Sequence, residues 1–260
     1  MIYSLHKAEK CGIMINTIVR GDCLKIMQDI PDKSIDLILA DPPFGTTKNN
    51  WDILVDPDAM WEQYKRIIKD NCPIILFGIQ PYSSTLITTS KGWYKYQWIW
   101  EKSQAGNFAV AKHMPLSVAE DILVFGKGKV TYNPQMTPRE KPRKNGGTSS
   151  DKNGRGFNGI KNVYTISNET YPRNILRYPT VVRKQSLHPS QKPVELLEYL
   201  IKTHSNKDAV ILDSFCGSGS TIIAALKQSR NYIGIELSES YFQMTLKRVK
   251  EHQHALAENV

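Results

Sequence analysis

Short apolar runs alternate with amphipathic segments along most of the chain. The apolar runs predict strands at residues 15–19, 35–40, 73–79, 94–100, 122–125, 209–213 and 231–235. Apolar residues at helical spacing predict helices at residues 24–30, 57–70, 82–90, 194–203, 222–227 and 238–251. Because continuous apolar strands that alternate with helices are typical of buried parallel sheets, we predict an α/β fold with a mostly parallel sheet flanked by helices.

Two segments depart from this pattern. Residues 1–13 show no strong hydrophobic period and are predicted to be a dispensable N-terminal extension. Residues 127–187 are rich in Gly, Asn, Pro and Arg and predict a mostly irregular insertion, with enough apolar residues at 164–182 for a small packed element. The chain therefore divides into residues 1–13, 14–126, 127–187 and 188–260.

The positive charge of the chain is concentrated in the insertion. The formal net charge is +9, and residues 127–184 hold 13 Lys and Arg against three acids, which gives +10 for that segment and about −1 for the rest. A neutral body with a basic insert indicates a localised phosphate-binding surface, since Lys and Arg supply the sequence-independent part of nucleic-acid affinity. The alternative is an ordinary soluble protein with a basic loop.

Cysteine spacing and hydropathy exclude several other classes. The four cysteines are widely separated and form no C-x-x-C pair, which argues against a zinc site and fits reduced thiols in the cytoplasm. Apolar runs have strand length, and the first residues lack the hydrophobic core of a signal peptide. We therefore expect a cytoplasmic protein without metal or membrane association.

The tetrapeptide Asp41-Pro42-Pro43-Phe44 ends the apolar run at residues 35–40. Proline removes a backbone donor and fixes φ, so the chain leaves the sheet here in a defined direction. A carboxylate, a proline carbonyl and an aromatic ring at the carboxyl end of a strand suit an exocyclic amine on a flat base. The alternative is a rigid Pro-Pro turn. Residues 45–50, which include Lys48, are polar enough for a mobile active-site loop.

A second constellation lies near the C-terminus. The strand ending in Asp213 leads into a turn with Gly217 and Gly219, then a helix, then a strand ending in Glu236, 23 residues after Asp213. Glycines let the backbone approach a ligand, and the second acid suits ribose hydroxyls. The turn is not G-x-G-x-x-G and lacks a P-loop lysine, so it favours a nucleoside such as S-adenosylmethionine over a dinucleotide or triphosphate. The alternative is a tight strand-to-helix turn.

Taken together, these motifs resemble the DNA amino-methyltransferases, which modify adenine N6 or cytosine N4. The match is to the circularly permuted group, in which a catalytic block comes first, target recognition second and the cofactor block last. The matching segments are Asp41–Phe44, the His-Pro-Ser-Gln-Lys-Pro run at residues 188–193, the loop at residues 213–221, Gly234-Ile235-Glu236 with Tyr241, and Gly21-Asp22.

The resemblance implies a Rossmann-like methyltransferase fold in permuted order. Residues 14–126 would be its catalytic half, residues 127–187 a basic target-recognition insertion, and residues 188–260 its cofactor-binding half. The implied cofactor is S-adenosylmethionine and the implied partner is double-stranded DNA. Similar enzymes suggest a homodimer, and the resemblance leaves open whether a cognate restriction endonuclease exists.

The resemblance also implies a role for each site residue. Asp41 and the Pro42 carbonyl would accept the amino hydrogens of a flipped base, with Pro43 holding the turn and Phe44 stacking on the base. Glu236 would bind the cofactor ribose, Asp22 its adenine side, and Ser190 and Lys192 the methionine carboxylate. The turn from Phe215 to Thr221, with Gly217 and Gly219, would bind the methionine moiety, and Asp41 and Asp213 are further expected cofactor contacts.

Basic side chains outside these motifs are candidate DNA contacts, to guanine or to phosphate. They are Lys48, Arg139, Lys141, Arg143, Lys144, Arg155, Arg173, Arg177 and Arg183. The sequence gives no recognition site, because no motif in the insertion pairs particular side chains with particular bases.

Asp41 favours adenine, because similar cytosine-N4 enzymes more often carry Ser at that position. Attack on cytosine C5 is disfavoured, since the chain has no Pro-Cys dipeptide. RNA and protein-glutamine methyltransferases usually place the cofactor block first, the reverse of the order here. A non-catalytic basic nucleic-acid binder on a degenerate fold would predict broken site residues, whereas those named above are intact.

Overall fold

The computed structural model describes residues 2–10, 13–45, 54–145, 165–181 and 191–257. Two compact units are present, Met1–Asn133 with Asn174–Val260 (the core unit) and Pro134–Arg173 (the insert unit). None of the described helices is long and apolar enough to cross a membrane.

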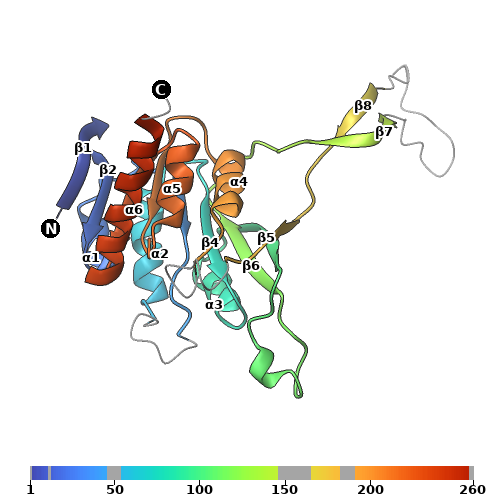
Figure 1. The fold of residues 1–260 in the computed structure, drawn as a ribbon, viewed down its shortest axis with the longest axis horizontal. Coiled ribbons are helices and arrows are strands. Elements are labelled where there is room, and N and C mark those ends of the chain that lie inside the picture. The colour runs from blue at the N-terminus through green and yellow to red at the C-terminus, as the bar shows by residue number, and fades with distance from the viewer. Residues whose placement is uncertain (1, 11–12, 46–53, 146–164, 182–190, 258–260) are drawn as a thin grey trace. The chain divides into compact units, whose positions relative to one another are not determined.

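A nine-stranded sheet organises the core unit, in the order β1-β2-β11-β10-β3-β4-β6-β5-β9 (Figure 1). The strands are β1 Ile2–Lys10, β2 Ile13–Arg20, β3 Leu37–Ala40, β4 Ile74–Gly78, β5 Tyr94–Lys102, β6 Ala119–Phe125, β9 Ile175–Tyr178, β10 Val210–Asp213 and β11 Asn231–Glu236. The central run β2-β11-β10-β3-β4 is parallel, whereas β6 pairs antiparallel with both β4 and β5. The predicted α/β fold with a mostly parallel sheet is confirmed.

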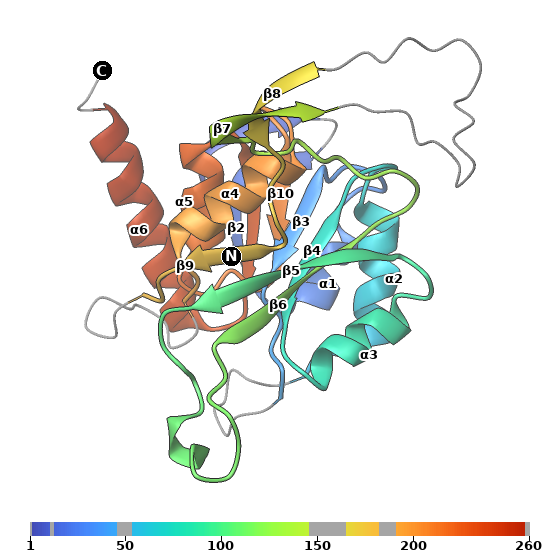
Figure 2. The same cartoon turned by 90° about the vertical axis from the view of Figure 1, so that its right-hand side faces the viewer.

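Helices cover both faces of this sheet, as Figure 2 shows. They are α1 Cys23–Gln28, α2 Pro57–Ile67, α3 Tyr82–Thr89, α4 Val194–His204, α5 Ser220–Lys227 and α6 Glu239–Ala257, and a 3-10 turn, η1, spans Phe108–Val110. Strand β3 explains the two layers, since Leu37 and Leu39 pack with α4, α5 and α6 while Ile38 and Ala40 pack with α1, α2 and α3. Because successive side chains of a strand point to opposite faces of the sheet, each buried strand contributes apolar residues to both hydrophobic cores.

Local signals set the helix starts. The Asp56 side chain accepts a 3.0 Å hydrogen bond from the N–H of Asp58 and caps α2, which Pro57 opens. The helix ends at Ile67, earlier than the predicted residue 70, because Ile68 turns extended and bridges to Ile35. Pairing with the sheet therefore overrides the helical period in the last predicted turn.

The first residues form a strand although their hydrophobic period is weak. Strand β1 pairs antiparallel with β2 at the edge of the sheet, with an irregularity between Ser4 and Ala8. An edge strand can be held by backbone hydrogen bonds to its neighbour, so a weak hydrophobic period does not exclude it.

The insertion holds more regular structure than its composition predicts. In the insert unit β7 Thr137–Asn145 pairs antiparallel with β8 Thr165–Thr170. Strand β9, from the part expected to hold a packed element, joins the core sheet parallel to β5. Backbone pairing again supplies order that hydrophobic periodicity does not reveal.

Candidate active site

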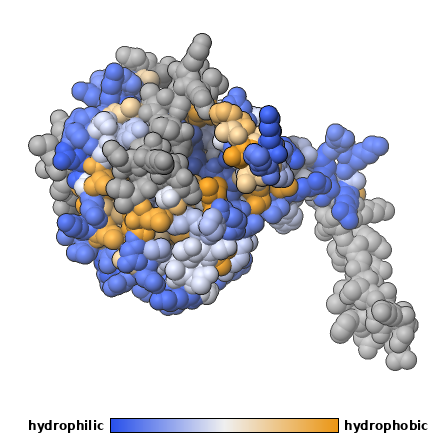
Figure 3. Space-filling model, turned by 90° about the horizontal axis from the view of Figure 1, so that it is seen from below, coloured by the Kyte–Doolittle hydropathy of each residue, from blue (hydrophilic) through white to orange (hydrophobic). Residues whose placement is uncertain are grey.

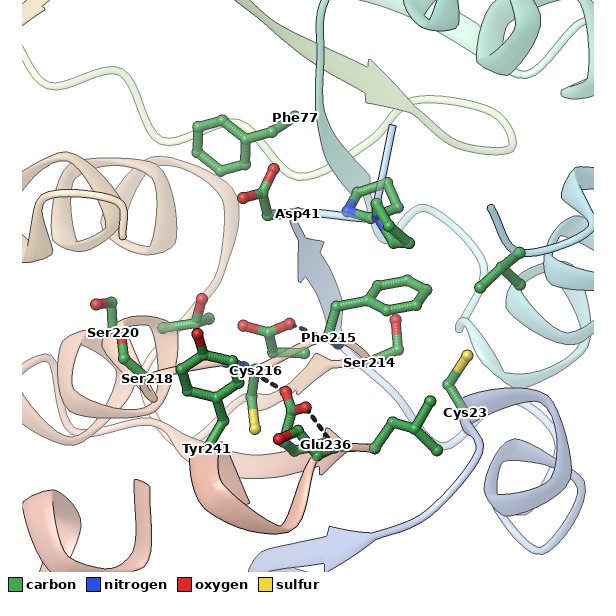
Figure 4. A pocket seen from close by; sticks show the side chains of 18 of the residues that line it. Cys23, Asp41, Phe77, Ser214, Phe215, Cys216, Ser218, Ser220, Glu236 and Tyr241 are labelled. Atoms are coloured by element: carbon green, nitrogen blue, oxygen red, sulfur yellow. Dashed lines mark hydrogen bonds between the residues drawn. The ribbon is translucent and has the colours of Figure 1, made fainter. Parts of the chain in front are cut away.

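The carboxyl ends of neighbouring parallel strands carry acids around one cavity. Asp22 follows β2, Asp41 follows β3, Asp213 ends β10 and Glu236 ends β11. All four line a cavity of about 840 Å³ in the core unit, with side chains that Figure 4 shows from close by. This volume is within the range of small-molecule sites, and the carboxyl edge is where open α/β sheets bind ligands.

The face seen in Figure 3 looks onto this edge of the sheet. Hydrophobic residues lie across its middle, with hydrophilic residues along much of its rim. The cavity lining is similarly mixed, since Phe44, Leu54, Phe77 and Phe215 lie among the acids. Such a lining suits a ligand with flat apolar faces and polar edges.

Residues Asp41 to Phe44 all line the cavity, so the first predicted constellation lies at the site. Pro42 is buried and Phe44 half-buried, with its ring centroid 5.6 Å from that of Tyr82. Phe44 packs against the hydrophobic cores on both faces of the sheet. The ring is therefore supported from behind while it remains part of the cavity wall.

Lys192 lies against Asp41. Its Nζ is 2.6 Å from Asp41 Oδ2 and 2.9 Å from Glu120 Oε1, and its side chain is 9% exposed. Burial alone lowers the pKa of Lys192, but the negative charges of Asp41 and Glu120 outweigh it and raise that pKa above its ordinary value. Lys192 is thus a charged ammonium that bridges two carboxylates.

The turn after β10 is held by backbone hydrogen bonds to the two acids of the second constellation. Asp213 Oδ1 accepts from the N–H of Phe215 at 3.0 Å. Glu236 accepts from the N–H groups of Gly217 and Ser238, both at 2.8 Å. Figure 4 shows Glu236 among the labelled lining residues below Cys216. The turn and the acid at the end of β11 therefore form one structure, as their spacing predicts.

Gly219 occupies a position that other residues would strain. It caps α5 with φ of 78°, in the left-handed region, and a Cβ there would lie 2.6 Å from Thr245 Cγ2. Thr245 in turn donates a 2.6 Å hydrogen bond to the carbonyl of Gly217. Gly219 is needed for this packing, whereas Thr221, also a predicted site residue, lines the cavity on the first turn of α5.

Burial changes the protonation of both acids in this constellation. It raises the pKa of Asp213 to about 7, against the opposing effect of its hydrogen bonds with Thr221 and Phe215. It also raises the pKa of Glu236, although backbone donors at Ser238 and Gly217 pull the other way. The cavity therefore favours a positively charged ligand group, which would restore the ionised form of these carboxyls.

Asp22 caps a helix and also lines the cavity. Its side chain caps α1 by accepting from the N–H groups of Leu24 at 2.8 Å and Lys25 at 3.3 Å. It also lines the cavity beside Cys23. Burial raises the pKa of the Cys23 thiol to about 12, so this neighbour is an apolar wall and not a nucleophile.

Sequence reasoning missed Glu120, which is 8% exposed and contacts Lys192. A signal was present, because Glu120 and Asp121 are two acids that open the otherwise apolar run of β6. A buried charge in such a strand needs a partner, but the partner lies 72 positions further along the chain. Tertiary structure was needed to find it.

The candidate DNA contacts lie in several places. Arg139, Lys141, Arg143 and Lys144 are on β7, and the Arg139 Nε donates to the Glu169 carbonyl at 2.8 Å. Arg177 lies on β9 of the core unit, with its Nε 2.8 Å from Glu101 Oε2. Arg173 ends the insert unit. The remaining candidates, Lys48, Arg155 and Arg183, and also Ser190, lie outside the described residues.

Within the described ranges, no cluster of three or more His, Cys, Asp or Glu side chains has the arrangement of a metal site. The acids around the cavity belong to separate strands and contact backbone N–H groups or Lys192 instead.

Known proteins of similar sequence match this chain over most of its length. DNA adenine methyltransferase YhdJ of Escherichia coli is 28% identical, over 96% of this chain and 87% of its own. Type II methyltransferase M.HpaI of Haemophilus parainfluenzae is also 28% identical, over 91% of this chain and 74% of its own.

Solved structures share the fold. The M1.HpyAVI–SAM complex covers 89% of this chain and 98% of its own at 22% identity, with a TM-score of 0.61. The cytosine-N4-specific PvuII DNA methyltransferase covers 88% and 84% at 14% identity, with a TM-score of 0.62. The family model for DNA methylases of the N6/N4 type matches residues 35–247, which span both constellations of the cavity. The chain therefore belongs to the N6/N4 DNA methylase family.

Proposed function

We propose that the protein transfers a methyl group from S-adenosylmethionine to the exocyclic N6 of adenine in double-stranded DNA. The observation that carries this proposal is that Asp41–Phe44 line the same cavity as Asp213, Glu236 and the turn after β10. One constellation suits an amine on a flat base and the other a nucleoside with a positive tail. Methyl transfer needs both ligands side by side.

The cavity residues fit the cofactor. Glu236 accepts one hydrogen bond on each oxygen from backbone N–H groups, and a carboxylate oxygen has a further lone pair for a ribose hydroxyl. Asp41 is a carboxylate and Asp213 a buried carboxyl that a cationic tail would ionise, and Phe215 and Leu237 offer apolar contacts. When bound, S-adenosylmethionine supplies an electrophilic methyl group on a positively charged sulfur.

The substrate amine must be made a better nucleophile, because its lone pair is delocalised into the ring. Hydrogen bonds from the amino hydrogens to Asp41 and the Pro42 carbonyl favour a pyramidal nitrogen with its lone pair aimed at the methyl group. Phe44, supported by both cores, would stack on the flipped base and offset part of the cost of extrusion. The amine proton leaves after transfer, so no strong general base is needed.

Three features support adenine and DNA as the substrate. The first residue of the tetrapeptide is Asp41, which favours adenine over cytosine. YhdJ, which matches nearly the whole chain, is a DNA adenine methyltransferase. The basic strand β7 supplies Lys and Arg side chains suited to phosphate, in keeping with a double-stranded DNA partner.

Digested DNA from a methylation-free host that expresses the protein tests the proposal. We expect N6-methyladenine by mass spectrometry of the nucleosides, and modification-sensitive sequencing should place it within one recognition sequence. The matched control is the same host expressing Asp41→Ala. Detection of N4-methylcytosine instead of N6-methyladenine would show that cytosine is the target base. Methylation confined to RNA would overturn the DNA assignment.

A further inference from the structure

Four side chains of alternating charge form a series of ion pairs that ends at the cavity. Lys102 Nζ lies 3.4 Å from Glu120 Oε2, Glu120 Oε1 lies 2.9 Å from Lys192 Nζ, and Lys192 Nζ lies 2.6 Å from Asp41 Oδ2. The four exposed fractions are 16%, 8%, 9% and 21% in that order. The series thus leads from the end of β5 to the acid of the proposed amine site.

These groups come from distant parts of the sequence. Glu120 is the second residue of β6, Asp41 follows β3, and Lys192 precedes α4. The register explains their meeting, since β4 lies between β3 and β6 and its last residue, Gly78, pairs with Asp121. The antiparallel direction of β6 brings its first residues to the carboxyl edge of the parallel strands.

Further contacts fix the Lys192 ammonium from other directions. Its Nζ lies 4.8 Å from the Phe77 ring centroid and 6.0 Å from that of Phe44. Lys192 therefore touches the acid and the ring that are proposed to hold the amine and the base. A shift of this one ammonium would disturb both groups.

Glu120 differs from Asp41 in one respect that matters for its role. Asp41 and Lys192 line the cavity, whereas Glu120 is not among the lining residues. Buried charges are costly and are retained where their partners are in place, and loss of one partner leaves the other uncompensated. A second carboxylate behind Lys192 means that the ammonium is ion-paired with two acids and not with Asp41 alone.

We infer that Glu120 is a positioning residue for methyl transfer, which anchors Lys192 so that Asp41 keeps its orientation and its strength as an acceptor for the amine. Without Glu120, Lys192 would pair with Asp41 alone, and a carboxylate committed to one ammonium accepts weakly from a neutral amine. This inference rests on the proposed function, because it assigns Asp41 to the substrate amine.

The variant Glu120→Gln tests this, since it keeps the shape of the side chain and removes its charge. We expect kcat to fall about 10- to 100-fold, the scale of small misplacements at a reacting centre. The KM for DNA and the Kd for S-adenosylmethionine should change less than about threefold, because Glu120 touches neither ligand. The matched control is Glu198→Gln, which removes a carboxylate that is 19% exposed and 2.6 Å from Lys227, away from the cavity lining.

A double-mutant cycle separates an effect through Lys192 from a general loss of stability. If Glu120 acts through Lys192, kcat of Glu120→Gln/Lys192→Met should match that of Lys192→Met within about threefold. Independent, multiplied losses would contradict the inference. If Glu120→Gln does not fold, as shown by the loss of its thermal unfolding transition, Glu120→Asp takes its place. Glu120→Asp keeps the charge but shortens the side chain by one methylene, and kcat should fall by a similar factor. An unchanged kcat in a folded variant would overturn the inference.

A crystal structure of Glu120→Gln supplies a readout that does not depend on turnover. We expect Lys192 and the Asp41 carboxylate to move relative to their wild-type positions, and unchanged positions would contradict the inference. Inactivity of the wild type on every DNA would instead refute the proposed function, so the two failures are distinguishable.

Discussion

Glu236 Oε2 accepts a 2.8 Å hydrogen bond from the backbone N–H of Gly217, and this contact joins the end of β11 to the turn after β10. Its other oxygen accepts from Ser238 at the start of the segment leading to α6. One carboxylate thus organises both the turn and the approach to the last helix. Any ligand that reaches Glu236 meets a group that is already oriented by the backbone.

Replacing Glu236 by Ala should weaken cofactor binding. The change removes the proposed ribose acceptor and the two backbone contacts, and charge-assisted hydrogen bonds of this kind contribute about 1.5 to 3 kcal/mol each. We expect the Kd for S-adenosylmethionine to rise at least about 10-fold in calorimetry. Glu239→Ala, on α6, is the control and should bind like the wild type; an unchanged Kd for Glu236→Ala would exclude Glu236 from the cofactor site.

Asp41→Ala should abolish methyl transfer and leave cofactor binding measurable. The variant removes the acceptor for the amine and one partner of Lys192, so we expect kcat to fall by at least about 1,000-fold. Single-turnover transfer to DNA and calorimetry with S-adenosylmethionine separate the two effects. Retained turnover would remove Asp41 from the reaction, and Asp36→Ala, which alters an acid paired with Lys69, controls for loss of an acid elsewhere in the core unit.

Asp213 should make the stability of the ligand-free protein depend on pH. Its pKa is raised to about 7 in the fold against an ordinary value of 3.8, so the folded state holds the proton more tightly. The stabilisation of the folded state by protonated Asp213 is therefore fully present below about pH 4 and is lost as the pH rises through about 7. The wild type should therefore lose roughly 4 kcal/mol of unfolding free energy relative to Asp213→Asn between about pH 4 and pH 7.

Urea unfolding at a series of pH values measures this difference. A difference that stays constant or increases with pH would show that Asp213 is not held protonated in the fold. Asp208→Asn, at a residue in the loop before β10, controls for the loss of a nearby carboxyl.

Two glycines in the left-handed region form a matched pair. Gly92→Ala, with φ of 88° and open space around the added Cβ, should cost about 1 kcal/mol of unfolding free energy from backbone strain alone. Gly219→Ala adds a contact with Thr245, whose hydroxyl is tied to the Gly217 carbonyl, so we expect roughly 2 to 4 kcal/mol. Equal losses in chemical denaturation would exclude the Thr245 contact as a constraint.

The basic strand of the insert unit should contribute to DNA affinity through phosphate. Lys141 and Arg143 on β7 are exposed, and the double variant Lys141→Ala/Arg143→Ala should weaken binding to all duplexes similarly. The slope of log K against log salt should become shallower by up to about 0.9 per side chain. Lys247→Ala/Lys250→Ala on α6 is the charge-matched control, and equal slopes for the two double variants would place the phosphate contacts elsewhere.

Local sequence determined much of this protein. Apolar runs specified the strands of the parallel sheet because buried strands need both faces apolar, and Asp56-Pro57 marked the start of α2. The tetrapeptide at Asp41 and the turn from Asp213 to Glu236 were visible because each requires particular residue types at fixed short spacing. Their common position at one edge of the sheet followed from the rule for parallel strands.

Tertiary structure alone decided how distant charges meet. Edge strand β1 and strand β9 are held by pairing with neighbours, a signal that hydropathy does not carry. Lys192 was expected at the cofactor carboxylate, and in the structure it bridges Asp41 and Glu120. The physical reason is that a charged residue in an apolar strand shows from sequence alone that a partner of opposite charge is required. Which residue becomes that partner depends on strand order and register.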